Sequence, residues 1–212
     1  MSRSGSAERV IEAAVAWQVA PPGGPGVLVL AIDGHGGAGK STIAGAVARA
    51  TGAALVHTDD FFRTPTVRPY PAAAGARAMA CYYDWRRLRA QALEPLRARR
   101  AATFRRFDWE RGRGLDGTVV VVEPGNLVLV EGVFSAAPEL SDLVDRSVFV
   151  QTPERERLRR LRRQITPEEW DADWLIAEQA YFDLVRPPSS FDLVVTGTSR
   201  PAPAGSKAVT ST

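Results

Sequence analysis

The segment that most constrains this chain is residues 34–41, GHGGAGKS, which satisfies every position of the pattern G-x-x-x-x-G-K-[ST]. A continuous apolar run of strand length, Val27 to Ile32, comes before it, and a helical pattern over residues 40–51 follows. The glycines let consecutive backbone N–H groups curve around an anion, and the start of the helix adds a partial positive charge. An ordinary Gly-rich turn is the alternative, but the strand before and the helix after favour a phosphate-binding loop.

The loop supplies the groups that a nucleoside triphosphate requires. Lys40 is expected to reach the β- and γ-phosphates, and the Ser41 hydroxyl is expected to hold Mg²⁺. Lys40 is one of only two lysines among 27 basic side chains, so arginine serves elsewhere while the loop keeps a compact ammonium on a flexible stem. Further nucleotide contacts are expected from Gly34, Gly36, Gly37, Ala38, Gly39 and Thr42. The predicted ligands are therefore a nucleoside triphosphate and Mg²⁺, with ATP as the expected donor and another nucleoside triphosphate as the alternative.

Apolar runs of strand length alternate with helical patterns along the chain. Strands are predicted over residues 27–32, 53–56, 127–130, 147–150 and 191–195. Helices are predicted over residues 7–18, 40–51, 85–99, 153–165 and 167–185. Two weaker extended segments, 102–109 and 117–123, flank a Gly-rich turn and are predicted to form a hairpin. The alternation predicts an α/β fold, a three-layer P-loop NTPase sandwich around a parallel sheet.

Length and composition limit how the chain is organised. Its 212 residues suit one sizeable core, so we expect a single domain over residues 1–196 and a disordered tail over residues 197–212. The Pro-, Ala- and Gly-rich stretch 63–83 is expected to be a long loop, either a lid or a partner site. No apolar run approaches the roughly 18 residues of a membrane span, and no signal-peptide pattern is present. With its single cysteine, Cys81, the chain is expected in the cytoplasm, and the sequence leaves open whether it forms a homo-oligomer.

The charge pattern argues against generic nucleic-acid binding, because the net charge is only +3 and is spread along the chain. One predicted helix, residues 153–165, nevertheless carries six arginines. Its buried stripe is predicted to consist of Leu158, Leu161 and Ile165. Its solvated face is predicted to carry Arg155, Arg159, Arg162 and Arg163. An RNA-binding helix is the rival interpretation of this segment, and a tight, salt-sensitive affinity for RNA would support it.

Carboxylates follow two of the predicted strands. Asp59 and Asp60 come after the second strand, at the edge of the sheet where ligand sites of α/β proteins form. Transfer of a phosphoryl group to an alcohol needs a carboxylate that orients the hydroxyl and takes its proton. Because adjacent residues on an extended stretch point to opposite sides, only one of the two is expected to face the phosphates. Glu131 ends the strand 127–130 and is expected near Mg²⁺, although a solvated Asp-Asp turn and a plain helix cap remain alternatives.

Taken in order, these segments resemble the uridine kinase group of the P-loop kinases, to which phosphoribulokinase and bacterial pantothenate kinase also belong. The family segments Asp-x-Phe-Tyr-Arg, Asn-Phe-Asp-His and Tyr-Asp-Phe have counterparts in TDDFFR at residues 58–63, YYDW at 82–85 and FDW at 107–109. The stretch 119–132 is similar to the family's Val-Glu-Pro strand and its Ile-Leu-Glu-Gly. Residues 157–163 resemble the arginine-rich lid, and residues 185–187 resemble the Arg-Pro segment. The similarity covers nearly the whole chain.

The resemblance implies roles for individual residues. It makes Asp59, rather than Asp60, the catalytic carboxylate. It implies that Asp84 binds hydroxyls of the acceptor. It adds Phe107, in the covering hairpin, and Arg186 to the substrate site.

The same resemblance implies how charge is balanced at the phosphates. In the lid, Arg160 and Arg163 are expected to offset the charge that develops on the transferred phosphoryl group. The residues expected on the metal side are Ser41, Glu131 and Asp59.

The predicted activity is transfer of the γ-phosphate of ATP to a hydroxyl of a small molecule, with the 5′-hydroxyl of uridine or cytidine as the first expectation. The acceptor pocket departs from the family pattern, because the histidine expected after residue 109 is missing. Trp85 also stands where the family has His, and Phe62 where it has Tyr. A pantothenate-like alcohol or a sugar therefore remains an alternative acceptor. A non-catalytic nucleotide switch that signals through residues 63–83 is the alternative from another class.

Overall fold

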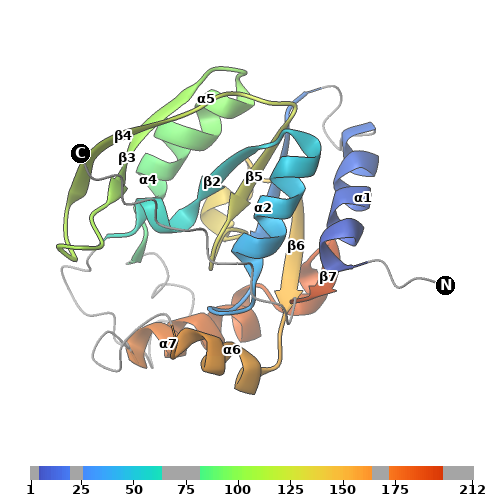
Figure 1. Ribbon diagram of the computed structural model, residues 1–212, viewed down its shortest axis with the longest axis vertical. Helices are drawn as coiled ribbons and strands as arrows, with labels where there is room; N and C mark the ends of the chain where they lie inside the picture. The colour runs from blue at the N-terminus through green and yellow to red at the C-terminus, as the bar shows by residue number, and fades with distance from the viewer. Residues whose placement is uncertain (1–4, 20–25, 64–81, 164–171, 198–212) are drawn as a thin grey trace, which may run out of the picture.

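The apolar segments of the sequence form one parallel sheet with the strand order β2-β5-β1-β6-β7 (Figure 1). The computed structural model describes residues 5–19, 26–63, 82–163 and 172–197. Every residue of β1 is buried, because Leu28, Leu30 and Ile32 enter one hydrophobic core while Val29 and Ala31 enter the other. The strands are β1 Leu28–Asp33, β2 Ala54–His57, β5 Leu127–Glu131, β6 Arg146–Gln151 and β7 Leu193–Thr196.

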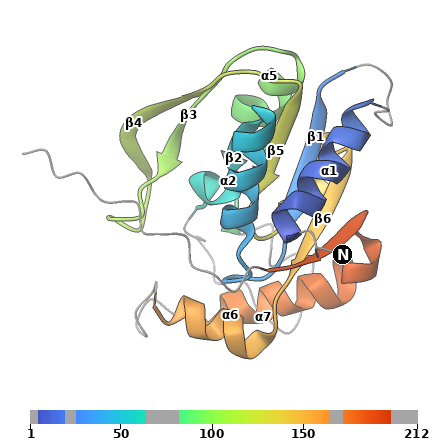
Figure 2. The same cartoon turned by 45° about the vertical axis from the view of Figure 1, so that its right-hand side comes forward.

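Helices cover both faces of this sheet. On one face α1 (Ser6–Val19) and α2 (Lys40–Thr51) lie side by side (Figure 2), and both contribute to the same core. The other face is covered by α4 (Trp85–Leu88) and α5 (Glu94–Arg97). The predicted three-layer α/β sandwich with a parallel sheet is therefore confirmed.

The predicted helix 85–99 contains a widened π turn, η2 (Arg89–Leu93), between α4 and α5. Pro95 follows this turn at the start of α5. Proline has no N–H for the carbonyl four residues earlier, so the regular α-helical ladder is interrupted there. A π turn widens the ladder by one residue and lets the chain continue as a helix.

The predicted hairpin is present as a separate two-stranded antiparallel sheet of β3 (Ala102–Phe107) and β4 (Leu115–Val122). Its register shifts between Arg105 and Phe107. Ala102, Phe104 and Phe107 are buried, and Ala102 and Phe104 belong to the same core as α4 and α5. The hairpin thus lies beside the helices that follow β2 (Figure 1).

The C-terminal helices lie across the end of the sheet at which β6 terminates (Figure 1). They are α6 (Glu154–Leu161) and α7 (Ala172–Ala180), and α7 continues as a π turn, η5 (Tyr181–Val185). Three 3-10 turns complete the described elements: η1 Thr58–Phe61, η3 Pro138–Leu140 and η6 Pro188–Ser190.

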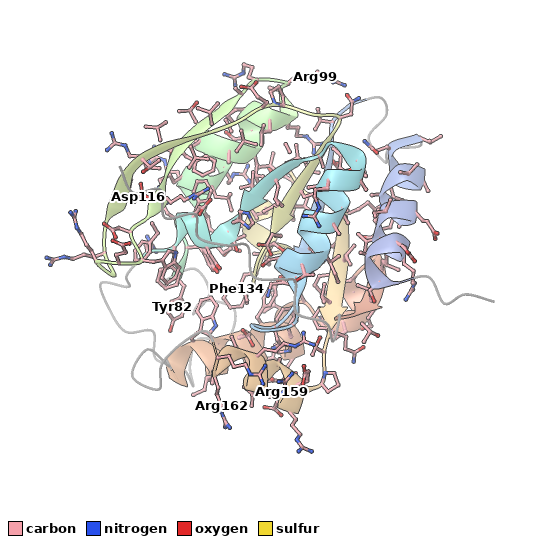
Figure 3. All side chains as sticks on the ribbon, in the orientation of Figure 1. Tyr82, Arg99, Asp116, Phe134, Arg159 and Arg162 are labelled. Atoms are coloured by element: carbon pink, nitrogen blue, oxygen red, sulfur yellow. The ribbon has the colours of Figure 1, made fainter. Side chains whose placement is uncertain are left out.

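The buried face of α6 differs from the prediction. Leu158 and Leu161 are only half-buried, while Arg157 is buried to 6% exposure because its guanidinium has a buried carboxylate partner. Ile165 lies outside the described residues. The predicted solvated arginines are exposed, and Figure 3 shows Arg159 and Arg162 pointing away from the body of the protein.

Two predictions fall mainly on residues that the structure does not describe. Of the expected loop 63–83, residues 64–81 lie outside the described ranges, as do residues 198–212 of the expected tail. The extent of the domain, residues 1–196, stays a prediction. Across the described ranges, no helix combines the length and the apolar character needed to cross a membrane.

Candidate active site

Three neighbouring strands end at the same edge of the sheet and bring the predicted site residues together. β5 lies between β2 and β1, and Glu131 is in register with His57 on one side and Ile32 on the other. The loop 34–41 follows β1, Glu131 ends β5, and Asp59 lies two residues beyond β2. Parallel strands carry their ligand-binding residues at this carboxyl edge.

The backbone of the loop needs glycine at positions that a side chain would block. Gly34 has φ 143° and Gly37 has φ 73°, both in the left-handed half of backbone space. A Cβ atom at Gly34 would lie 2.6 Å from the Val150 carbonyl oxygen, and one at Gly37 would lie 2.5 Å from the Arg157 carbonyl oxygen. The glycines therefore allow β6 and α6 to pack directly on the loop.

The phosphate loop folds around the side chain of Lys40, which is itself a residue of the loop. Its side chain is nearly buried, and Nζ donates hydrogen bonds to the carbonyl oxygens of Gly34, at 2.8 Å, and His35, at 3.0 Å. The ammonium thus lies at the start of α2, where the helix terminus already favours an anion. The arrangement suits phosphate oxygens as ligands.

Ser41 and Glu131 place two oxygen ligands next to the loop. Ser41 Oγ donates to Glu131 Oε2 at 3.3 Å, and Glu131 is 4% exposed. The other oxygen of Glu131, Oε1, lies 2.5 Å from His57 Nδ1. This hydrogen bond raises the pKa of His57, against the opposing effect of burial. Hard oxygen ligands are those that Mg²⁺ prefers, so this pair fits the expected metal.

Asp59 and Asp60 occupy the 3-10 turn η1, and not the extended stretch on which the sequence argument relied. Asp59 is exposed as a residue, but its carboxylate is partly covered by protein, and Oδ1 accepts a hydrogen bond from the Tyr83 hydroxyl at 3.0 Å. Desolvation by the surrounding protein, and then the charge of Glu131, raise the pKa of Asp59. Asp60 instead pairs with Arg106 at 3.4 Å. The two neighbouring carboxylates therefore have different surroundings.

The residues expected at the acceptor do not all converge. Asp84 caps α4, since its Oδ1 accepts the N–H of Arg87 at 3.0 Å, and its backbone N–H binds the Phe61 carbonyl beside Asp59. Phe107 meets Phe62 edge to face, with ring centroids 5.1 Å apart.

Arg186 lies elsewhere. Its Nη2 donates to Ser147 Oγ, near the start of β6, at 3.1 Å, and its guanidinium covers the ring of Phe191. The carboxyl edge of the sheet is at the other end of β6, so the structure does not bring Arg186 to the loop.

The two lid arginines that the resemblance singled out differ in position. Arg160 Nη1 lies 3.3 Å from the Gly37 carbonyl oxygen, and its Nε donates to Glu156 at 2.9 Å. Arg163 is exposed beyond the end of α6. Arg160 is thus already at the phosphate loop.

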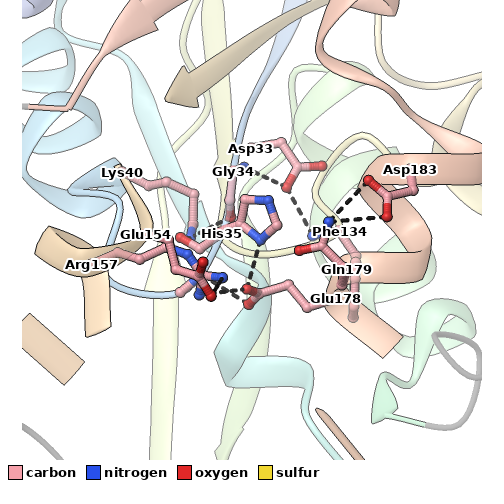
Figure 4. A network of polar contacts seen from close by, with 11 residues as sticks. Asp33, Gly34, His35, Lys40, Phe134, Glu154, Arg157, Glu178, Gln179 and Asp183 are labelled. Carbon is pink, nitrogen blue, oxygen red and sulfur yellow. Dashed lines mark hydrogen bonds and ion pairs between the residues drawn. The ribbon is translucent and has the colours of Figure 1, made fainter. Parts of the chain in front are cut away.

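Glu178 is a site residue that the sequence argument missed (Figure 4). It is 1% exposed and accepts hydrogen bonds from His35 Nδ1 at 2.8 Å, from the Gly36 N–H at 2.9 Å and from Arg157 Nη1 at 3.3 Å. It therefore joins α7 and α6 to the phosphate loop. The sequence did carry a signal, because Glu178 lies three residues before Tyr181 and four before Phe182, on the apolar face of its helix.

Asp33, the last residue of β1, is a second buried carboxylate at the loop. It accepts the N–H groups of Gly34, Phe134 and Ala136 and the hydroxyl of Tyr181, at 2.7–3.0 Å. Burial raises the pKa of Asp33, although these donors oppose the effect. The residue fastens the segment after β5 to the start of the loop.

Comparison with known proteins identifies related folds. No protein-family model matches the sequence, and no curated protein matches it. A structure described as a possible uridine kinase from Bacillus stearothermophilus superposes with a TM-score of 0.63 at 21% identity, over 89% of this chain and 96% of the other.

Two further solved structures share the architecture. One, described as a fructose transport system kinase from Silicibacter sp. TM1040, has a TM-score of 0.58 and 19% identity over 91% of this chain and all of the other. A D-glycerate 3-kinase from Cryptococcus neoformans var. grubii has a TM-score of 0.57 and 12% identity over 89% of each chain. At the level of the fold, these neighbours confirm the predicted resemblance to uridine kinase-like proteins.

Proposed function

We propose, from the P-loop kinase fold that this chain has, that the protein transfers the γ-phosphate of ATP to a hydroxyl group of a small molecule. The observation that supports this proposal best is that the phosphate loop, Glu131 and Asp59 lie at the ends of three adjacent strands. A phosphate loop alone accounts for nucleotide binding. The added carboxylate at the same edge provides a base for an acceptor alcohol.

In this proposal the loop binds the triphosphate. Lys40 and the backbone N–H groups of residues 34–42 contact the β- and γ-phosphates. Ser41 and Glu131 would hold Mg²⁺ and already lie within 3.3 Å of one another, whereas Asp59, also expected on the metal side, is assigned here to the acceptor. When bound, Mg²⁺ neutralises negative charge on the phosphate oxygens.

Asp59 takes the proton of the acceptor hydroxyl as its oxygen bonds to the γ-phosphorus. The bond between that phosphorus and the β–γ bridging oxygen breaks, and ADP leaves with the bonding electrons. Arg160 and Arg163 offset the charge on the moving phosphoryl group, and Arg160 needs the smaller displacement because it already lies at the loop.

The identity of the acceptor alcohol is to be found by testing candidate compounds. Uridine and cytidine are the first compounds to test, with Asp84 binding their ribose hydroxyls and Phe107 in the covering hairpin. The solved neighbours are described as a possible uridine kinase, a fructose transport system kinase and a D-glycerate 3-kinase, which broadens the choice to small alcohols. Pantothenate is also tested, because a pantothenate-like alcohol is one of the alternative acceptors.

A panel of uridine, cytidine, pantothenate, fructose and glycerate with ATP and Mg²⁺ tests the function, with ADP release and product mass as readouts. We expect one phosphorylated alcohol, which Lys40→Ala abolishes and Asp59→Asn lowers by about 10²–10⁴-fold. Asp60→Asn is the matched control, because the neighbouring carboxylate pairs with Arg106 and should affect turnover far less. Full turnover by Asp59→Asn would refute the assigned base. Nucleotide binding without any phosphorylated product would favour a nucleotide switch.

A further inference from the structure

The Tyr83 hydroxyl is aimed at Asp59 from a rigid position. Its oxygen lies 3.0 Å from Asp59 Oδ1, and the Tyr83 side chain is 1% exposed. The ring packs among Phe62, Trp85 and Phe134, with ring centroids 5.1–6.1 Å away. A buried ring wedged between other rings cannot change rotamer without opening the core.

The backbone also ties Tyr83 to the turn that carries Asp59. Phe62 and Tyr83 form an antiparallel β-bridge. On either side of it, the Arg63 N–H binds the Tyr82 carbonyl at 3.0 Å, and the Asp84 N–H binds the Phe61 carbonyl at 2.9 Å. The distance between the phenol and the turn is therefore set by hydrogen bonds of the main chain.

Asp59 itself needs such a support. It lies on a turn of four residues in which Thr58 and Phe61 are buried, so the backbone of the turn is anchored, while Asp59 is an exposed residue whose carboxylate is only partly covered by protein. A carboxylate that is only partly covered samples several rotamers, and each one that faces away from the acceptor is unproductive. A fixed donor on Oδ1 selects one rotamer and leaves Oδ2 for the acceptor hydroxyl.

We propose that Tyr83 is a positioning residue that holds Asp59 in the rotamer from which it accepts the proton of the substrate. This inference rests on the proposed function. Tyr83 does not touch the reacting atoms; it acts through Asp59. The loss of its hydroxyl should therefore slow the chemical step and leave nucleotide binding at Lys40 unaffected.

Phe62 and Tyr83, the two residues of the β-bridge, have ring centroids 5.8 Å apart. Of the two, only Tyr83 carries a hydroxyl, and that hydroxyl reaches Asp59.

The test compares Tyr83→Phe with wild type, using ATP, Mg²⁺ and the acceptor found in the panel. We expect kcat to fall by about tenfold, the effect of losing one hydrogen bond to a charged group, and KM for ATP to stay within about twofold. Tyr82→Phe is the matched control, because it removes the adjacent buried hydroxyl and leaves the bond to Asp59 in place. The thermal midpoint of each variant reports whether the fold is intact.

A double-mutant cycle separates positioning from a purely structural role. Single-turnover assays with labelled ATP can follow the residual activity of Asp59→Asn, and there Tyr83→Phe should cause no further loss. Tyr82→Phe should change both backgrounds by the same factor. The inference is overturned if Tyr83→Phe has the wild-type kcat, or if it lowers turnover equally in both backgrounds.

The two proposals fail in distinguishable ways. If wild-type protein phosphorylates no member of the panel, the proposed function fails and this inference falls with it. If wild type is active and Asp59→Asn is not, but Tyr83→Phe is unchanged, only the role of Tyr83 is refuted.

Discussion

Two glycines with nearly the same backbone conformation show how single positions shape this site. Gly37 has φ 73° and Gly52 has φ 69°. Gly52 ends α2, and a Cβ atom there would meet nothing within 4 Å, whereas one at Gly37 would lie 2.5 Å from the Arg157 carbonyl oxygen. The left-handed backbone is common to both, so only the contact with α6 distinguishes them.

Alanine substitution should separate these two effects. Gly52→Ala is expected to lower the free energy of unfolding by about 1 kcal/mol, the cost of a left-handed backbone for a residue with a Cβ atom. Gly37→Ala should cost about 3 kcal/mol or more and weaken nucleotide binding, because α6 must also move. Urea unfolding of the two variants measures the difference. Equal losses would mean that α6 does not pack on the loop as described.

At the scale of elements, a buried carboxylate joins α7 and α6 to the phosphate loop. Burial by itself would raise the pKa of Glu178, but the hydrogen bond and charge of His35 and the Gly36 N–H outweigh burial, so its pKa lies below the ordinary value of 4.5. A carboxyl group with a lowered pKa in the folded state stabilises the fold above its unfolded pKa. That contribution is lost as the pH falls below about 4.5.

Glu178→Gln tests this connection. At pH 7 we expect it to lower the free energy of unfolding by about 3 kcal/mol, because Arg157 loses its buried counter-charge and keeps only the exposed Glu154, at 3.8 Å. Between pH 7 and pH 4, urea unfolding of the variant should depend less steeply on pH than that of wild type, since the titrating group is gone. Asp183→Asn, which alters an exposed hydrogen-bonded pair with Gln179, is the control at pH 7 and should change stability little. Wild-type stability of Glu178→Gln at pH 7 would contradict the assignment.

At the scale of the whole molecule, the loop is the place where the sheet, the helix α2 and the C-terminal helices meet. β6 and α6 approach its glycines, and α7 binds its backbone through Glu178. A ligand on the loop should therefore stabilise elements from both ends of the chain together. The predicted single domain over residues 1–196 is in keeping with this arrangement and stays a prediction.

Thermal unfolding with ATP and Mg²⁺ tests whether a ligand at the phosphate loop stabilises the whole fold. At about 100 times its Kd, a ligand of the folded state adds about 2.7 kcal/mol, which for a chain of this size raises Tm by roughly 5–10 °C. Lys40→Ala should remove most of that shift, because the ammonium lies within the loop. Lys207→Ala, at the other lysine of the chain, is the matched control and should retain it. An unchanged Tm with nucleotide would contradict nucleotide binding at the loop.

Much of the fold was predictable because local patterns encode local structure. The apolar runs became the five strands of a parallel sheet, the loop 34–41 joined β1 to α2, and the weaker extended segments formed the hairpin. Element ends were off by one to a few residues, and the π turn before Pro95 was missed. Periodicity and turn residues act over a few positions of the chain, and these are the distances over which sequence patterns are informative.

The pairing of distant residues was decided only by the tertiary structure. Glu178 binds His35 across 143 positions of the chain, and Tyr83 reaches Asp59 through a β-bridge that no local pattern indicates. Arg157, which the sequence placed on neither the buried stripe nor the solvated face of its helix, is buried, whereas Arg186 lies away from the site that its segment suggested. The sequence alone determined that a phosphate loop lies between a strand and a helix. The tertiary structure decided which carboxylates, hydroxyls and arginines surround it, because strand order and helix packing bring together side chains that are far apart in the chain.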